Sequence, residues 1–306
     1  MEFRGGVFPI LLTPFSRDGS LDLESLRRMV RYYMRASVDG LTILGGEVSE
    51  SEALTQEERE SIIRTVMEET SGSVPVVCGI TMPSDRQVLM EAERAARLGG
   101  VDAFLLGPHR GGQVPMSTIL GGRYRSVSKK YALPTVVLDN PALASPGSVW
   151  TPEAIVSEAE NVVCVKVEEQ PSPPKVRAIR AALGTSISIL GGALHGRNLL
   201  WELAEGADGG VMTSAPIPEH LVSIYRLFRE GKVEEATDLF AKTLPLANFY
   251  PERTVAVKKA ILKELGVISE PLTRDPFPPL DEGSMVHLRR LLQWTLENTK
   301  AGMLLR

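Results

Sequence analysis

The chain alternates short apolar runs with longer amphipathic segments up to about residue 217, and this alternation constrains the fold more than any other feature. The intervening segments carry helix-start signals, such as capping boxes at residues 55–58 and 84–87. Strands that alternate with helices form parallel sheets, and eight strands close a (β/α)8 TIM barrel. Eight runs are predicted as strands: residues 7–12, 41–44, 74–80, 103–106, 135–138, 162–165, 187–190 and 210–212.

The competing fold is an open doubly wound sheet, which favours a Gly-x-Gly-x-x-Gly turn after an early strand. The sequence has no such turn. After the eighth run the pattern becomes purely helical, with amphipathic segments at residues 219–230, 233–246, 254–265 and 283–298. We therefore predict a barrel over residues 1–217 and a C-terminal helical extension over residues 218–306 that packs on it.

Composition excludes several classes of partner. The formal net charge is −4, and Lys and Arg are scattered among acidic residues, so nucleic acid is not an expected partner. No apolar run is long enough to span a bilayer, and the N-terminus lacks the pattern of a cleaved signal. The two cysteines, Cys78 and Cys164, lie within apolar runs and are expected to be reduced core thiols. We expect a cytoplasmic protein without a membrane partner.

Lys166 is the main candidate for chemistry. It follows the apolar run 162–165, and active sites of barrel enzymes lie at the carboxyl ends of the strands. Apolar surroundings disfavour the ammonium form and favour the free amine that imine formation needs. The alternative is a structural lysine, ion-paired with Glu168 or Glu169 at the barrel rim.

The order of several segments resembles the dihydrodipicolinate synthase / N-acetylneuraminate lyase family of Schiff-base aldolases. The similar segments are residues 6–15 with the turn 18–20, residues 49–58, residues 161–166 (Asn-Val-Val-Cys-Val-Lys), and residues 257–260 with 265–266. The resemblance implies a homotetrameric or homodimeric barrel with a helical tail. It also implies a covalent imine between Lys166 and a small carbonyl substrate such as a 2-keto acid, with no cofactor or metal.

The sequence departs from the family pattern at the residues that assist the lysine. The family usually reads Gly-Thr-Thr-Gly-Glu after the second strand, whereas this chain reads Gly-Glu-Val-Ser-Glu over residues 46–50. The family's tyrosine after the fifth strand falls on Asp139, and a tyrosine pair after the fourth falls near His109 and Arg110. We therefore expect Asp139 and His109 to transfer protons alongside Lys166. The predicted substrate-binding residues are Glu47, Val48, Ser49, Arg110, Gly192 and Val211.

Three functions fit this altered pocket. The first is a Schiff-base lyase, aldolase or dehydratase with a changed substrate. The second is a barrel enzyme without an imine, in which Glu47, Asp139, His109 and Glu168 bind a divalent metal. The third is a non-catalytic homologue that binds a small molecule. The first is preferred, because the lysine is retained and carboxylates stand at the strand exits.

Overall fold

The sheet of the protein, in a computed structural model, is parallel and has seven strands in sequence order. The described residues are 5–108, 123–131, 133–141, 151, 154, 162–192, 196–210, 215–249, 254–274 and 277–299. The strands are β1 (Leu41–Ile43), β2 (Val76–Ile80), β3 (Ala103–Leu106), β4 (Thr135–Asp139), β5 (Cys164–Val167), β6 (Ser188–Gly191) and β7 (Gly209–Gly210).

The N-terminal segment takes the place of the eighth strand of the barrel. Ile10 forms a parallel bridge with Thr42 of β1, and the Leu11 amide donates to the Thr42 carbonyl at 2.8 Å. On its other side, the Gly6 backbone lies so close to β7 that a Cβ on Gly209 would be 2.2 Å from the Gly6 carbonyl oxygen. This segment therefore bridges β1 and β7, and the predicted (β/α)8 barrel is confirmed.

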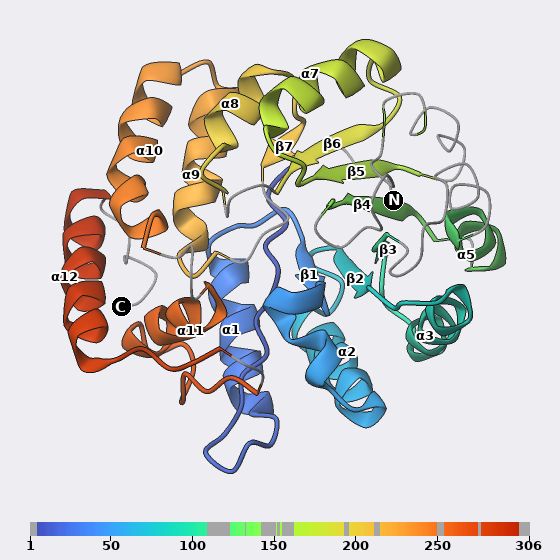
Figure 1. The fold of residues 1–306 in the computed structure, drawn as a ribbon, viewed down its shortest axis with the longest axis horizontal. Helices are drawn as coiled ribbons and strands as arrows, with labels where there is room; N and C mark the ends of the chain where they lie inside the picture. The colour runs from blue at the N-terminus through green and yellow to red at the C-terminus, as the bar shows by residue number, and fades with distance from the viewer. Residues whose placement is uncertain are drawn as a thin grey trace.

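Helices cover the outside of the barrel (Figure 1). Capping starts several of them: the Asp22 side chain accepts from the Ser25 amide, and both predicted capping boxes are present. The described helices of the barrel are α1 (Leu23–Arg35), α2 (Gln56–Thr70), α3 (Asp85–Leu98), α5 (Arg123–Tyr131), α7 (Ser172–Leu183) and α8 (Leu199–Ala204), with the 3-10 turns η1 (Gly46–Ser49) and η2 (Ser51–Ala53).

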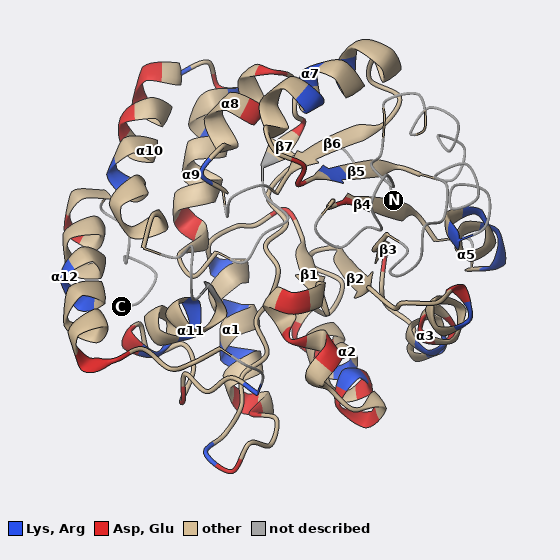
Figure 2. Ribbon diagram, viewed as in Figure 1, with Lys and Arg blue, Asp and Glu red and all other residues tan. Residues whose placement is uncertain are grey.

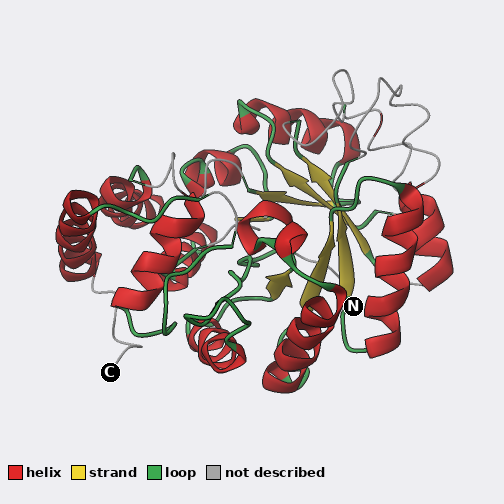
Figure 3. Ribbon diagram, turned by 60° about the horizontal axis from the view of Figure 1, so that its bottom comes forward, coloured by secondary structure: helices red, strands yellow, loops and turns green. Residues whose placement is uncertain are grey.

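The C-terminal helices are α9 (Pro218–Arg229), α10 (Val233–Ala247), α11 (Thr254–Glu264) and α12 (Glu282–Thr299). Figure 1 shows α10 and α12 side by side at one edge of the molecule, and Figure 3 shows helices around the strands from another direction. The helices α10, α11 and α12 share an apolar cluster that includes Leu246, Ile261 and Leu288. No helix in the described part of the chain is both long and apolar enough to cross a membrane.

Charged residues are interspersed along the outer helices rather than collected on one element, as Figure 2 shows for α2 and α12. Cys78 and Cys164 are both buried and unpaired with each other, as expected for core thiols. Burial raises the pKa of the Cys78 thiol to about 12, which makes it a poor nucleophile.

Successive side chains of each strand point to opposite faces of the sheet, and this divides the buried apolar residues into two sets. One set faces the barrel interior and includes Leu138, Cys164 and Leu190. The other faces the surrounding helices and includes Val165 and Val167. Side chains two residues apart on a strand point to the same face, so this division fixes which polar residues near the strand ends can enter the barrel mouth.

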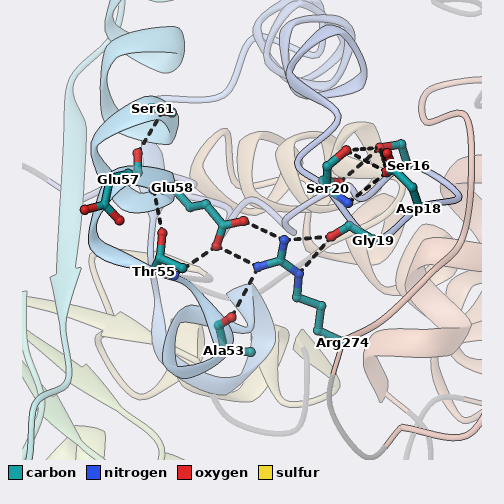
Figure 4. Close-up of polar contacts among 10 residues, drawn as sticks. All are labelled: Ser16, Asp18, Gly19, Ser20, Ala53, Thr55, Glu57, Glu58, Ser61 and Arg274. Atoms are coloured by element: carbon teal, nitrogen blue, oxygen red, sulfur yellow. Dashed lines mark hydrogen bonds and ion pairs between the residues drawn. The ribbon is translucent and has the colours of Figure 1, made fainter.

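An arginine ties the segment after α11 to the barrel loops. Arg274 holds the Glu58 carboxylate with two hydrogen bonds of 2.6 and 2.5 Å and donates to the Gly19 carbonyl at 2.7 Å (Figure 4). Its guanidinium also lies 4.3 Å from the centre of the Phe15 ring. A bidentate, stacked arginine fixes orientation as well as distance. The extension is thereby fastened to the turn that contains Gly19 and to the first turn of α2.

We predict that Gly209→Ala destabilises the protein by about 1–3 kcal/mol or more, because the new methyl group would collide with the Gly6 backbone. Gly283→Ala in α12 is the matched control, since its Cβ would meet only Asp281 Oδ1 at 3.4 Å. Urea unfolding measures both variants. Equal stability of the two would contradict barrel closure between Gly6 and Gly209.

Candidate active site

Lys166 lies within β5, and its side chain faces the barrel interior. Its strand neighbours in register are Leu138 and Leu190, both members of the interior cluster. The residue is 3% exposed, and its Nζ is 2.6 Å from Glu168 Oε1. The amine therefore occupies the predicted place, and it also makes the ion pair with Glu168 that the structural alternative required.

The Glu168 carboxylate is held on both oxygens. Oε1 contacts Lys166, while Oε2 accepts from Asn140 Nδ2 at 2.6 Å. The Glu168 amide also donates to the Asp139 carbonyl at 2.9 Å. Glu168 is thus the carboxylate that the described residues bring within 2.6 Å of the amine. The sequence contains the signal for it, since Glu168 is two residues beyond Lys166 and so faces the same way.

Gly192 leaves space for this pair. A Cβ at this position would be 2.7 Å from Lys166 Cε and 3.3 Å from Glu168 Cγ. The first distance is shorter than side-chain contacts tolerate, so any larger residue would displace the lysine. The structure therefore brings predicted residue Gly192 together with Lys166.

Asp139 lies on the other face of the sheet from the amine. It is in register with Val167, which packs against the surrounding helices, and its Oδ2 is 2.8 Å from the Nζ of Lys175 in α7. That contact is an ion pair without hydrogen-bond alignment. Burial raises the pKa of the Asp139 carboxyl to about 6, although the nearby Lys175 charge acts in the opposite direction. The expected placement of Asp139 beside Lys166 is thus wrong, because strand alternation turns it away.

The three predicted residues after β1 have different surroundings. Val48 is partly buried and packs on the interior cluster, whereas Glu47 is exposed. The Ser49 hydroxyl donates to the Leu11 carbonyl at 2.8 Å and accepts from the Gly45 amide at 3.0 Å. Val48 therefore contributes to the wall of the barrel mouth, while Ser49 holds η1 against the N-terminal segment.

The remaining predicted site residues, His109, Arg110 and Val211, lie outside the described residues, so their roles stay predictions. Within the described ranges, no group of three or more His, Cys, Asp or Glu side chains is arranged to hold a metal. The ligands expected for a metal site are also apart there, since Glu47 is exposed and Asp139 faces α7.

Comparison with known proteins identifies the family. The profile of the dihydrodipicolinate synthetase family matches residues 3–295. The chain belongs to this family. It is 31% identical over 286 residues to an L-2-keto-3-deoxyarabonate dehydratase of Azospirillum brasilense, covering 92% of each chain.

Other proteins that are similar to this chain include an aldolase and a synthase. A probable 2-dehydro-3-deoxy-D-pentonate aldolase of Escherichia coli is 28% identical over 296 residues, covering 93% of this chain and 94% of that one. The crystal structure of a dihydrodipicolinate synthase from Rhodopseudomonas palustris superposes with a TM-score of 0.86 at 26% identity, covering 95% of this chain and 97% of that one. The predictions of family, fold and lyase class are confirmed.

We predict that Asp139 makes stability fall as the pH rises. Its pKa in the folded protein, about 6, lies above the ordinary value of 3.8, so its stabilising contribution is complete below 3.8 and is lost as the pH rises through 6. Relative to Asp139→Asn, the wild type should lose about 2–3 kcal/mol of unfolding free energy between pH 4 and pH 7. Denaturant titrations at several pH values measure this difference, and parallel curves for the two proteins would contradict it.

Proposed function

We propose that the protein is an imine-forming dehydratase of a 2-keto-3-deoxy sugar acid, with Lys166 as nucleophile and Glu168 as the proton-transfer group. The observation that carries the proposal is the 2.6 Å contact between the buried Lys166 amine and the Glu168 carboxylate. The dehydratase relative from A. brasilense supports the choice of reaction. The family likeness to an aldolase makes carbon–carbon cleavage the second candidate.

The reaction begins when the Lys166 amine attacks the C2 carbonyl and water leaves, which forms an iminium ion. The iminium acidifies C3, and the Glu168 carboxylate removes a C3 proton as the electron pair moves toward nitrogen. The resulting enamine expels the C4 hydroxyl group, which takes a proton and departs as water. Hydrolysis of the unsaturated iminium then restores Lys166 and releases a dehydrated keto acid.

Glu168 suits this role because it is fixed beside the reacting nitrogen. Asn140 holds its second oxygen at 2.6 Å, so the carboxylate keeps its position when the lysine charge changes. A group two residues from the imine lysine, on the same face of the strand, is close to the carbon atoms that flank the imine. This arrangement compensates for the missing threonine and tyrosine residues of the usual family pattern.

The substrate carboxylate is assigned to Arg110 together with backbone amides near Val48, with His109 and Val211 also at the mouth. These assignments rest on the positions of the residues after the predicted strands. We also propose a homotetramer or homodimer located in the cytoplasm, on the basis of family likeness. One solved relative, 26% identical with a TM-score of 0.86, is described as a monomeric dihydrodipicolinate synthase variant. Light scattering therefore has to decide the assembly.

Borohydride trapping tests the imine. We expect the wild type, incubated with 2-keto-3-deoxy sugar acids or pyruvate and then reduced, to gain the mass of the keto acid at Lys166. Lys166→Ala should gain none, because it has no amine at this position. Intact-mass and peptide-mass spectrometry measure the adduct. A wild type that forms no adduct with any of these acids would contradict the proposal.

Glu168→Gln tests the proton transfer. We expect kcat for dehydration to fall by about 100- to 10,000-fold, as is typical when a general base is lost. Imine trapping at Lys166 should persist in this variant. Asp139→Asn is the comparison, since Asp139 faces α7. A larger loss of kcat in Asp139→Asn than in Glu168→Gln would assign the proton transfer to Asp139 instead.

A further inference from the structure

The ends of β4 and β5 are joined by polar side chains on two sides. On one side, Asn140 Nδ2 donates to Glu168 Oε2 at 2.6 Å and holds that carboxylate beside the amine. The chain neighbours of these two residues contact a different element. Asp139 directly precedes Asn140, and Glu169 directly follows the other member of the pair. Both of these neighbouring carboxylates bind the Nζ of Lys175 in α7.

Lys175 is largely shielded from water. Its Nζ lies 2.8 Å from Asp139 Oδ2, and it donates to Glu169 Oε2. The side chain of Lys175 is 10% exposed and that of Asp139 is 1% exposed, so salt and water screen this pair only weakly. Burial raises the pKa of the Asp139 carboxyl to about 6, and the carboxylate that binds Lys175 is therefore the main form at neutral pH.

The place of Lys175 in its helix depends on these carboxylates. It lies in the first turn of α7, which begins at Ser172. The first turn of a helix carries the positive end of the helix dipole and disfavours a cation. The carboxylates of Asp139 and Glu169 offset this repulsion. Because α7 lies against β5 and β6 (Figure 1), the lysine links the helix to the ends of β4 and β5.

This second link bears on the proton-transfer group, which lies just beyond the end of its strand. β4 ends at Asp139 and β5 at Val167, and the Glu168 amide donates to the Asp139 carbonyl at 2.9 Å. The side chains of Asn140 and Glu168 follow these ends, so contacts outside the strand ladder have to keep them at a fixed separation. Lys175 supplies such contacts, since it holds the residue next to each of them.

We propose that Lys175 is a positioning residue for Glu168, the proton-transfer group. By binding Asp139 and Glu169 together, it keeps the ends of β4 and β5 at a fixed spacing. This spacing lets Asn140 hold the Glu168 carboxylate beside the amine. The inference rests on the proposed imine chemistry, in which that carboxylate removes a C3 proton. Without the lysine, the other two carboxylates lose their common partner and repel one another when both are ionised.

Two reactions of pyruvate test the inference, because they depend on different groups. Borohydride trapping measures imine formation at Lys166. Exchange of the methyl hydrogens in D2O, followed by NMR, measures removal of the C3 proton by Glu168 and its replacement by deuterium. We expect Lys175→Met to be trapped about as fast as the wild type. It should exchange the methyl hydrogens at least about 10-fold more slowly, since a base displaced by about 1 Å loses much of its effect.

Arg177→Met is the matched control, because it removes a cation from the same helix whose partner, Glu205, caps the end of α8. It should keep both wild-type rates. Glu169→Gln is a second variant that removes one ion pair at the more exposed end of the cluster, and it should lower exchange without lowering trapping. A wild-type ratio of exchange to trapping in Lys175→Met, or in Glu169→Gln should the first variant not fold, would overturn the inference. So would an equal loss of both rates, or the same loss in Arg177→Met, since these would show only a loosened helix.

Crystal structures without substrate separate this inference from the proposed function. We expect the 2.6 Å contact between Asn140 and Glu168 to lengthen beyond hydrogen-bonding distance in Lys175→Met and to persist in Arg177→Met. If the wild type neither traps pyruvate nor exchanges its hydrogens, but the contact is lost in Lys175→Met alone, Lys175 positions Glu168 and the dehydratase proposal fails. If the contact is unchanged in Lys175→Met, the inference fails whatever the result with pyruvate.

Discussion

The ion pair between Lys166 and Glu168 is the interaction on which the rest of the site depends. A lysine that is 3% exposed needs a compensating charge, and Glu168 supplies it at 2.6 Å. Surrounding features serve this pair: Asn140 holds the carboxylate, and Gly192 leaves space beside the lysine stem. An isolated buried pair is a weak source of stability. In the proposed imine chemistry, both groups of this pair have a role.

The fold and its reactive lysine could be predicted from the sequence because local signals determine them. The Thr55 and Ser84 capping boxes formed as expected, and a strand carries Lys166 into the barrel. The placement of Asp139 beside Lys166 was predicted wrongly because side chains alternate between the two faces of a strand. Once β5 is seen to run from Cys164 to Val167, alternation places Glu168 inside the barrel. The same rule turns Asp139 toward α7, where Lys175 pairs with it.

The contribution of α11 could not be predicted, for a different physical reason. Hydrophobic periodicity predicts that a helix forms, but it does not say where the helix docks. Lys259 and Glu50 are far apart in the sequence, and only the tertiary structure brings their charges together. Fully buried lysines are rare unless paired. Their occurrence at two consecutive positions of α11 became informative once burial was known.

The anchoring of α11 has a consequence for the order of events during synthesis. The ribosome releases the barrel segments before the residues that form α11, so a nascent chain can complete its strands while the tail is still missing. At that stage Glu50 and Phe15 lack their contacts with Lys259, and the mouth of the barrel is uncovered. These contacts between the tail and the loops at the mouth of the barrel are therefore made only once the chain has been completed.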